Sequence, residues 1–378
     1  MHIAYNGWFW DRPDTGSGQY LRHLLAALRR VAPELDMTLV LPPHTRTADN
    51  LPPDVNIITT NGPGGNPGKV LFEQWTFPRM VRRAGADIAH VPYWGPPLSS
   101  PAPLVTTILD VIPLVIPLYA SGFGPKLYTS LVTAAARGAS HVLTISNAAR
   151  SDIIRELGLP ESAVTTTYLA ADEAYHPRIG AERDAEVREK YDLPDSFVLY
   201  LGGFDARKQV RQLIAAWTYV SDAVGDEYPL VIAGREPVWG TPMFPDARRY
   251  AEELGVSDTI RWIGYVDEAD KPSLYRLASV FVYPSGYEGF GLPVLEAMAS
   301  GTPVVANEVS SIPEIVGDAA YLTPNGDSRT MGAAILALLL QPPLRETLVG
   351  AGLARATNFN WRKTARETLA VYERVMAR

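Results

Sequence analysis

Short runs rich in β-branched and aromatic residues alternate with longer, helix-like segments along the whole chain, in two successive series. Such alternation favours parallel sheets with helices on their faces, because two parallel strands need a long crossover connection. The first series predicts strands over residues 2–6, 37–42, 55–60, 87–91, 104–109, 140–145 and 164–169. The second predicts strands over residues 197–203, 229–233, 259–263, 279–283, 303–306 and 320–322. The sequence therefore predicts an α/β fold with two Rossmann-like domains.

The segment between the two series differs from both in composition. Residues 172–195 are charged, show no apolar period and contain Pro177, Gly180 and Pro194, which is typical of a linker with a lead-in helix. We therefore expect a first domain over residues 1–175, a linker over 176–195 and a second domain over 196–360. Residues 361–378 form an amphipathic helix by their apolar spacing.

Local patterns give further expectations within the first domain. Helical periodicity is clear in two places, and residues 61–68 are rich in glycine and proline, which indicates a loop. The residues that show this periodicity are Tyr20, Leu21, Leu24, Leu25 and Leu28 in one helix, and Leu127, Leu131 and Ala134 in the other.

Composition excludes several classes of function. The 378 residues include no cysteine, so disulfide frameworks and thiolate chemistry are excluded. The net charge is −7, with 14 basic and 14 acidic residues before residue 181, and this balance argues against nucleic-acid partners. The most apolar helical run, 333–340, is far shorter than the ~20 residues of a membrane span.

These features, with no visible signal peptide, predict a cytoplasmic protein. Three arginines close together, Arg79, Arg82 and Arg83, leave two interpretations open. They form either a solvated helix face or a peripheral contact with the anionic inner face of a membrane.

Two glutamates, Glu288 and Glu296, lie eight positions apart. Gly289 and Gly291 allow the backbone beside Glu288 to approach a ligand closely. Pro293 can open a short helix that carries Glu296, and a helix N-terminus favours a phosphate. Two spaced carboxylates that accept hydroxyl groups, next to such a helix, suit a nucleotide that bears a sugar.

This segment, with its continuations 302–307 and 312–320, resembles the retaining family-4 glycosyltransferases, whose signature is two glutamates separated by seven residues within a GT-B fold. The resemblance implies two Rossmann-like domains that face each other across a cleft, with a C-terminal helix that crosses back to the first. It implies that Glu296 binds ribose hydroxyls. The transferred sugar would be held by Glu288 together with the donor-binding residues Gly289, Phe290, Gly291 and Leu292.

A second motif begins where an expected strand ends, at Gly203, and continues to Arg207 and Lys208. Adjacent cations at a strand-to-helix turn can face a diphosphate, and their attraction grows as the leaving group gains charge. The motif resembles the family's glycine-glycine and arginine-lysine turn, with Gln209 where asparagine is common. We assign Arg207 and Lys208 to the donor diphosphate.

Two weaker signals also match the family. Gly16 and Gly18 open a helix after the first strand, where they serve either as a ligand loop or as a helix cap. Tyr265 and Val266 follow a strand and correspond to main-chain groups that meet the nucleobase; a plain strand exit is the alternative.

The first domain departs from the family at one position. The strand that ends in Asp110 resembles the family's strand ending in histidine-aspartate, but Leu109 takes the place of the histidine. Asp110 is kept as a candidate catalytic residue. His90, at another strand end, is either a partial substitute or a structural residue.

No metal-ligand spacing is visible, so we expect no metal or other cofactor. The resemblance implies transfer of a sugar, with retention, from a UDP- or GDP-sugar to an acceptor hydroxyl of a glycan, a lipid-linked molecule or a small molecule. Two alternatives stay open, a sugar-nucleotide-binding protein with weak catalysis and a GT-B epimerase. The oligomeric state is left undetermined.

Overall fold

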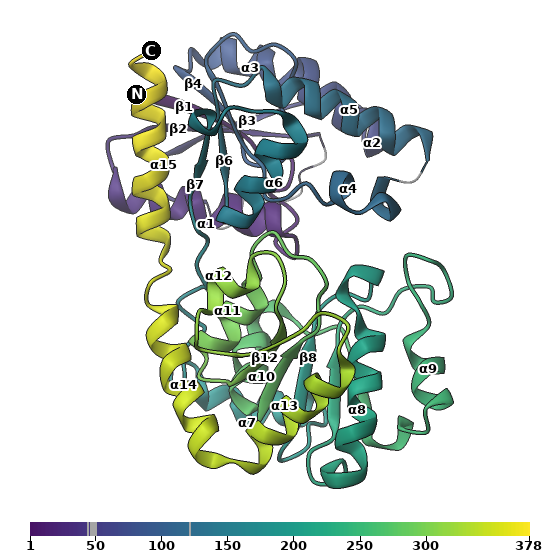
Figure 1. Cartoon of the computed structure of the whole chain (residues 1–378). Coiled ribbons are helices and arrows are strands. Elements are labelled where there is room, and N and C mark those ends of the chain that lie inside the picture. Colours follow the sequence, from purple (N-terminus) through teal and green to yellow (C-terminus); the bar gives the residue numbers. More distant parts are fainter. Residues whose placement is uncertain (44, 46–50, 121) are drawn as a thin grey trace. The chain divides into compact units, whose positions relative to one another are not determined.

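The computed structural model describes residues 1–43, 45, 51–120 and 122–378. The chain divides into two compact units (Figure 1). Unit 1 comprises Met1–Leu169 together with Asn360–Arg378, and unit 2 comprises Ala170–Phe359. None of the described helices combines the length and the apolar character needed to cross a bilayer.

Unit 1 is built on a seven-stranded parallel sheet in the order β3-β2-β1-β4-β5-β6-β7. The chain order reverses between β1 and β4, and ligands of open α/β sheets bind beyond the carboxyl ends of strands at such a switch point. The sequence prediction of these strands is confirmed. They are β1 (His2–Asn6), β2 (Asp36–Leu41), β3 (Val55–Thr59), β4 (Ile88–Val91), β5 (Leu104–Thr107), β6 (His141–Thr144) and β7 (Val164–Thr166).

Helices connect these strands, as parallel pairing requires. They are α1 (Gly16–Val31), α2 (Gly65–Leu71), the π-helical turn η1 (Phe72–Thr76), α3 (Phe77–Ala84), α4 (Ile112–Val115), α5 (Phe123–Arg137), α6 (Asn147–Leu157) and α15 (Trp361–Met376), with 3-10 turns η2 (Pro117–Ala120) and η3 (Glu161–Ala163).

The C-terminal helix α15 is part of the core of unit 1. It packs against α1, and the His23 and Trp361 rings stack with their centroids 4.9 Å apart. The Tyr372 side chain is fully buried, and its hydroxyl lies 2.6 Å from His90 Nδ1. The apolar face predicted for α15 is therefore the face that holds it to unit 1.

Unit 2 repeats the arrangement with a six-stranded parallel sheet in the order β10-β9-β8-β11-β12-β13, whose switch point lies between β8 and β11. All six predicted strands are confirmed. They are β8 (Val198–Leu201), β9 (Leu230–Ala233), β10 (Ile260–Gly264), β11 (Val280–Tyr283), β12 (Val304–Asn307) and β13 (Tyr321–Thr323).

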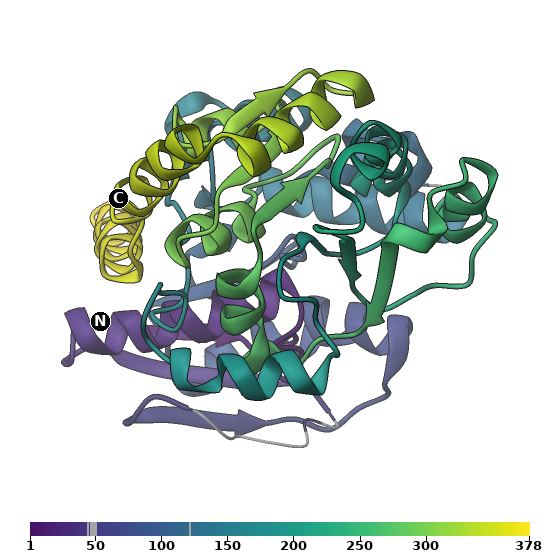
Figure 2. The ribbon, with the colours of Figure 1, turned by 90° about the horizontal axis from the view of Figure 1, so that it is seen from below.

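The helices of unit 2 cover both faces of its sheet (Figure 2). Alternate residues of a strand point to opposite faces, so Val198 and Tyr200 pack with Leu213 and Trp217 of α8, while the Phe281 ring meets Tyr275 of α10. The helical elements are η4 (Ala181–Arg183), α7 (Asp184–Lys190), η5 (Ala206–Lys208), α8 (Val210–Val224), α9 (Ala247–Glu253), η6 (Ser257–Thr259), η7 (Glu268–Asp270), α10 (Lys271–Leu277), α11 (Leu292–Ala299), α12 (Ile312–Val316), α13 (Ser328–Leu340) and α14 (Pro342–Ala356).

The segment between the two series belongs to unit 2 rather than forming a separate linker. The boundary falls after Leu169 instead of residue 175. The expected lead-in helix is α7, and its Asp184 carboxylate lies 2.6 Å from the buried Arg276 guanidinium of α10. Charged residues are common in linkers, but here an ion pair fixes them to the neighbouring helix.

Of two local predictions in unit 1, one is wrong and one is confirmed. Residues 61–68 are not entirely a loop, because α2 begins at Gly65; proline is tolerated in the first turn of a helix. The helix predicted around Leu127 is confirmed as α5; Leu127 itself is 61% exposed, and the buried residues of this helix are Val132, Ala135 and Ala136. A short apolar repeat identifies a helix without fixing which side the sheet covers.

Candidate active site

The candidate site of unit 2 lies beyond the carboxyl ends of β8 and β11, the two strands at the switch point. From β8 the chain passes through the exposed Gly203 into the turn η5, which carries Arg207 and Lys208. From β11 it passes through Ser285 to Glu288. Sheet topology thus brings together two motifs that are 80 residues apart in the sequence.

Glu288 is the centre of this site. Its Oε1 atom accepts hydrogen bonds from Arg207 Nη1 at 2.6 Å and from Lys208 Nζ at 2.6 Å. The hydroxyls of Tyr283, at 2.8 Å, and Ser285, at 2.5 Å, donate to the same oxygen. The side chains of Glu288, Arg207 and Lys208 are only 11–12% exposed, so the carboxylate and both cations are held in fixed positions.

The charges of this group follow from its contacts. Burial would raise the pKa of Glu288, but the Lys208 ammonium and the Arg207 guanidinium outweigh it and lower the pKa to about 2. Burial lowers the pKa of Lys208, while Glu288 opposes this effect. Glu288 is therefore an ionised acceptor at neutral pH, and two cationic donors surround it.

The turn that carries the cations has an unusual backbone. Gln209 ends η5 with φ of +49°, a left-handed conformation that asparagine tolerates better than most residues. The Gly286 N–H donates to the Arg207 carbonyl at 2.7 Å, and a Cβ at Gly286 would overlap the end of the Gln209 side chain. This close approach fixes η5 against the loop of Glu288.

A second loop supports Glu288 from the other side. Ser310 adopts φ of +43°, and its Oγ accepts a hydrogen bond from the Glu288 N–H at 2.8 Å. Ser311 Oγ donates to the Glu288 carbonyl at 2.9 Å and to the Phe290 carbonyl at 2.8 Å. A non-glycine residue in this conformation is strained, and such strain is found where the surroundings fix a functional loop.

The short helix predicted around Glu296 is confirmed as α11, with Pro293 in its first turn and Gly291 as its N-cap at φ of +98°. Gly289 and Phe290 are buried, and Leu292 is partly buried. A Cβ at Gly291 would lie 2.5 Å from Ile312 Cδ1, so both conformation and space require glycine there.

Glu296 lies within unit 2 and is 7% exposed. Its Oε2 accepts a hydrogen bond from the Tyr275 hydroxyl at 3.0 Å. Burial raises the pKa of this carboxyl to about 7, although Lys271 opposes the shift. The two glutamates of one motif therefore have opposite pKa shifts, because Glu288 contacts two cations and Glu296 contacts a phenol.

The remaining donor-side candidates follow β10. Tyr265 is 44% exposed and the Arg235 guanidinium lies 5.0 Å from its ring centroid, whereas Val266 is buried. Gly264 before them adopts φ of +71° and accepts a hydrogen bond from the Gly234 N–H. The Tyr265 side chain is thus the accessible part of this strand end.

The two glycines at the start of α1 lie in different surroundings. Gly18 is buried, its N–H donates to Thr15 Oγ1 at 3.2 Å, and a Cβ would overlap the Arg12 carbonyl. These contacts are those of a helix N-cap. Gly16 is exposed, and its Cβ position would lie 3.8 Å from Leu109 Cδ1, which places the loop of Leu109 beside it.

Asp110 and His90 have separate environments in unit 1. Asp110 Oδ1 accepts from the Ile112 N–H at 3.1 Å and precedes α4. His90 is fully buried, with Nε2 at 2.8 Å from Thr107 Oγ1 and Nδ1 bonded to Tyr372, and burial lowers its pKa to about 3. His90 is therefore a neutral core residue that holds α15 to the sheet.

Sequence reasoning missed four residues of the site, namely Tyr283, Ser285, Ser310 and Ser311. Tyr283 ends β11, so its place at the carboxyl end of a strand was a usable signal. The serines show no comparable pattern. Among the described residues, no group of three or more His, Asp or Glu side chains is arranged to hold a metal ion.

Comparison with known proteins places this geometry in a family. Residues 15–175 match the family model for Glycosyltransferase Family 4, and residues 183–354 match that for Glycosyl transferases group 1. The O-antigen chain mannosyltransferase B of Escherichia coli is 35% identical over 300 residues, 78% of this chain and 77% of that protein. The alpha-D-kanosaminyltransferase of Streptomyces kanamyceticus is 30% identical over 298 residues, 74% and 75% of the respective chains.

Solved structures show the same fold. Sucrose-phosphate synthase from Thermosynechococcus elongatus superposes with a TM-score of 0.77 at 22% sequence identity, over 100% of this chain and 99% of that one. This likeness shows the GT-B fold for the two parallel sheets. Because the family models match both units and an E. coli relative is similar over most of its length, this chain belongs to the family-4 glycosyltransferases.

Proposed function

We propose that this glycosyltransferase moves a sugar, with retention of anomeric configuration, from a nucleotide diphosphate donor to a hydroxyl of a polysaccharide acceptor. The observation that supports it most strongly is the convergence of Arg207 and Lys208 on Glu288 at the switch point of unit 2. Mannose is the first sugar to test, because the E. coli relative is named a mannosyltransferase; the Streptomyces relative is named for kanosamine.

The two cations suit a diphosphate leaving group. A cation about 4 Å from a phosphate charge contributes ~4 kcal/mol at an effective dielectric of ~20. Both cations contact the carboxylate of Glu288, and Arg207 Nε also lies 3.5 Å from Asp205 Oδ1, so a diphosphate would compete with these carboxylates for the cations. Since the leaving group gains negative charge during the reaction, these contacts strengthen toward the transition state. Their charge would support donor departure without a metal ion.

The two glutamates suit the sugar parts of the donor. Glu288 is ionised, and a carboxylate is an acceptor for hydroxyls of the transferred sugar. The backbone of Gly289–Gly291 leads to the N-terminus of α11, which favours negative charge. Glu296 in the second turn of that helix would accept the ribose hydroxyls, and the exposed Tyr265 would lie by the base.

Donor binding and turnover test this proposal directly. We would measure thermal stabilisation and nucleotide release with a panel of UDP- and GDP-sugars, on the wild type and on an Arg207→Ala/Lys208→Ala variant. Stabilisation by one donor, lost in the variant, is expected. A matched control, Arg249→Ala/Arg261→Ala, removes two exposed cations elsewhere in unit 2 and should keep the response. No response of the wild type to any donor would contradict the proposed site.

One observation favours a second candidate, a sugar-nucleotide-binding protein with little transfer. Leu109 places an apolar side chain beside Gly16, where the family has a histidine. This candidate predicts donor binding without nucleotide release, and gain of release in a Leu109→His variant. Release by the wild type once an acceptor is added would exclude it, and isomerised donor without acceptor would indicate an epimerase.

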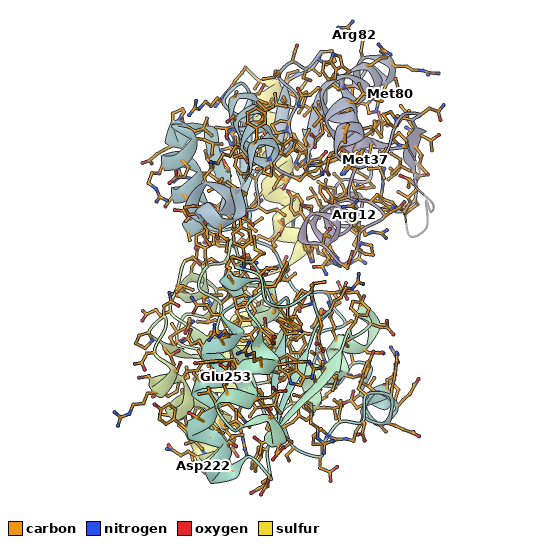
Figure 3. All side chains as sticks on the ribbon, turned by 90° about the vertical axis from the view of Figure 1, so that its right-hand side faces the viewer. Arg12, Met37, Met80, Arg82, Asp222 and Glu253 are labelled. Carbon is orange, nitrogen blue, oxygen red and sulfur yellow. The ribbon has the colours of Figure 1, made fainter. Side chains whose placement is uncertain are left out.

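We also propose peripheral contact with an anionic membrane. Leu71 and Trp75 are 40% and 60% exposed, and Arg79, Arg82 and Arg83 follow on the same continuous helical segment. Arg82 lies at the outer surface of unit 1 (Figure 3). Sedimentation with phosphatidylglycerol vesicles, but not with phosphatidylcholine vesicles, is expected, and Arg79→Glu/Arg82→Glu should abolish it. Equal binding to both vesicle types would contradict the electrostatic contact.

A further inference from the structure

Unit 1 has a polar cluster at its own switch point that the donor chemistry does not use. We define the Lys69 cluster as Asn6, Lys69, Glu73, Tyr93 and Tyr128. Asn6 ends β1 and Tyr93 follows β4, the two strands between which the chain order reverses. Lys69 and Glu73 come from α2 and η1, and Tyr128 comes from α5. Four separate segments thus converge where a sheet of this type binds its ligand.

The cluster is closely connected. Lys69 Nζ donates to the Tyr128 hydroxyl at 2.6 Å and lies 3.2 Å from Glu73 Oε1. The Tyr128 hydroxyl donates to both Glu73 oxygens at 3.1 Å. The Tyr93 hydroxyl donates to Asn6 Oδ1 at 3.2 Å. Glu73 lies in η1, a π-helical turn, and such turns within α-helices frequently occur at functional sites.

Aromatic rings surround the ammonium group of Lys69. The ring centroids of Tyr128, Tyr93 and Phe9 lie 4.5, 5.2 and 5.7 Å from Nζ. Phe9 is partly exposed, and its ring packs edge-on against Tyr93 with centroids 4.8 Å apart. A sugar has an apolar C–H face and polar hydroxyl groups. The accessible Phe9 ring can pack against such a face, and the neighbouring donors can bind the hydroxyls.

The cluster retains unused hydrogen-bonding capacity. The Lys69 side chain is 19% exposed, and Tyr128 and Glu73 take two of its three N–H donors. Asn6 is fully buried, and its Nδ2 has no hydrogen-bond partner among the described residues. Asn6 is closed to a ligand by its burial, so the donor that a ligand hydroxyl can reach is the third N–H of the partly exposed Lys69.

Charge narrows the class of ligand. Glu73 is fully buried beside the ammonium, so the pair carries no net charge toward a ligand. An acceptor phosphate or carboxylate would gain from Lys69 and lose against Glu73. A neutral hydroxyl can instead accept from the ammonium without this repulsion. The Lys69–Glu73 ion pair by itself therefore favours an uncharged polyol over an anion.

From this geometry we propose that the Lys69 cluster is the subsite for an uncharged acceptor sugar. Lys69 donates to one of its hydroxyls, Phe9 lies against its apolar face, and Glu73 excludes anionic acceptors. Tyr128 is a positioning residue, because it acts by holding Lys69. The inference rests on the proposed function, since an acceptor sugar has a role only in a transferase.

Lys69→Met is the first variant to test. With the donor fixed at saturation and a methyl mannobioside as acceptor, the acceptor KM should rise about 10-fold or more, because a charged hydrogen bond contributes ~1.5–3 kcal/mol. The KM for the donor and its thermal stabilisation should not change. Lys363→Met, an exposed lysine on α15 of the same unit, is the control and should match the wild type.

Glu73→Gln gives a test that a purely structural role would not pass. The amide keeps the size of the carboxylate and one acceptor oxygen for the Tyr128 hydroxyl, but leaves the Lys69 charge unbalanced. The ratio of kcat/KM for the monophosphate of the same mannobioside over the neutral compound should rise at least about fivefold, from the attraction of an unpaired cation. Tyr128→Phe should raise the acceptor KM less than Lys69→Met does.

The outcomes separate this inference from the proposed function. Unchanged acceptor KM and unchanged acceptor ratio in folded Lys69→Met and Glu73→Gln variants would overturn the subsite. If no donor is turned over by the wild type, saturation-transfer NMR with the methyl mannobioside decides. Signal that is lost in Lys69→Met would support sugar binding by the Lys69 cluster even though the proposed function fails, and signal equal in both proteins would overturn the subsite.

Discussion

Each unit places a glutamate, a lysine and a tyrosine beyond the strands of its switch point, yet the two glutamates differ in charge environment. Glu288 of unit 2 contacts two cations and two hydroxyls, and its pKa is lowered to about 2. Glu73 of unit 1 contacts one cation among aromatic rings, and burial raises its pKa. The same fold thus supports a carboxylate held in its ionised form in one unit and a carboxyl whose ionised form is disfavoured by burial in the other.

The difference shows how the number of nearby cations determines what a buried carboxylate can do. The attraction of a second cation outweighs desolvation and keeps the carboxylate ionised. An ionised carboxylate flanked by two cations suits a substrate that carries a diphosphate. With a single cation, desolvation still raises the pKa of the carboxyl, and for such a site we propose binding of neutral hydroxyls. The fold supplies the position beyond the strand ends, and a few side chains decide the chemistry.

The largest expected effect separates the two lysines. Lys208→Met should lower the kcat for nucleotide release about 10²–10³-fold, because it removes a preorganised donor to the leaving group. Lys69→Met should leave slow donor hydrolysis without acceptor within about twofold, since that reaction uses no acceptor. Release of nucleotide measured for both variants checks this. Equal losses would show that the two switch points are not functionally distinct.

The pH dependence of stability sharpens the comparison within unit 2. Folded Glu296 keeps its proton up to about pH 7, whereas the unfolded carboxyl loses it near its ordinary pKa of 4.5. The free energy of unfolding should therefore fall as pH rises from about 4.5 to 7, by up to ~1.4 kcal/mol per pH unit. Urea unfolding of the wild type and of Glu296→Gln at several pH values between about 4.5 and 7 measures this dependence. The variant should lose this slope, and an exposed control, Glu346→Gln, should keep it.

Substitution of one glycine in each unit tests how tightly the Lys69 cluster and the loop of Glu288 are packed. A Cβ at Gly95 would overlap the buried Tyr93 ring and Glu73 Oε1, whereas a Cβ at Gly286 would overlap only the flexible end of Gln209 and contact atoms beyond it. Gly95→Ala should destabilise unit 1 by about 1–3 kcal/mol, and Gly286→Ala should cost less than about 1 kcal/mol. Urea unfolding gives both values. The reverse order would mean that the loop of Glu288 is the more rigid of the two.

The smallest expected effect concerns His90. Tyr372→Phe removes the hydroxyl that lies 2.6 Å from His90 Nδ1 and should lower the free energy of unfolding by about 1 kcal/mol. The kcat should stay within about twofold, because His90 is buried in the core. A large fall in kcat without loss of stability would restore a catalytic role for His90.

Most of the fold could be predicted from the pattern of apolar residues in the sequence. All thirteen strands lie within one to three residues of their predicted ends, because buried parallel strands are short apolar runs between turn signals. The face of a helix that becomes buried was harder to predict, because it depends on which elements pack against the helix. Leu127, which is exposed, is an example. The ion pair of Asp184 with Arg276 joins residues 92 positions apart, and no local pattern encodes it.

The candidate site likewise contains residues that can be predicted from the sequence and residues that cannot. Glu288, Glu296, Arg207 and Lys208 stand in motifs that can be read from the sequence. That both cations contact the carboxylate of Glu288 depends on strand order, and Ser310 is recognised only from its backbone conformation. The Lys69 cluster was missed because it joins four segments by long-range packing, with no recurring spacing between them.

The discontinuity of unit 1 has a consequence for folding during synthesis. Residues 170–359 form unit 2 without interruption, so they can fold before α15 leaves the ribosome. Unit 1 must wait for α15, whose Tyr372 fills part of its core. Domains usually complete folding from the N-terminus onward, but here the unit that begins first finishes last. Until then the face of unit 1 that α15 covers stays uncovered, and apolar surface exposed in this way during folding is prone to aggregation.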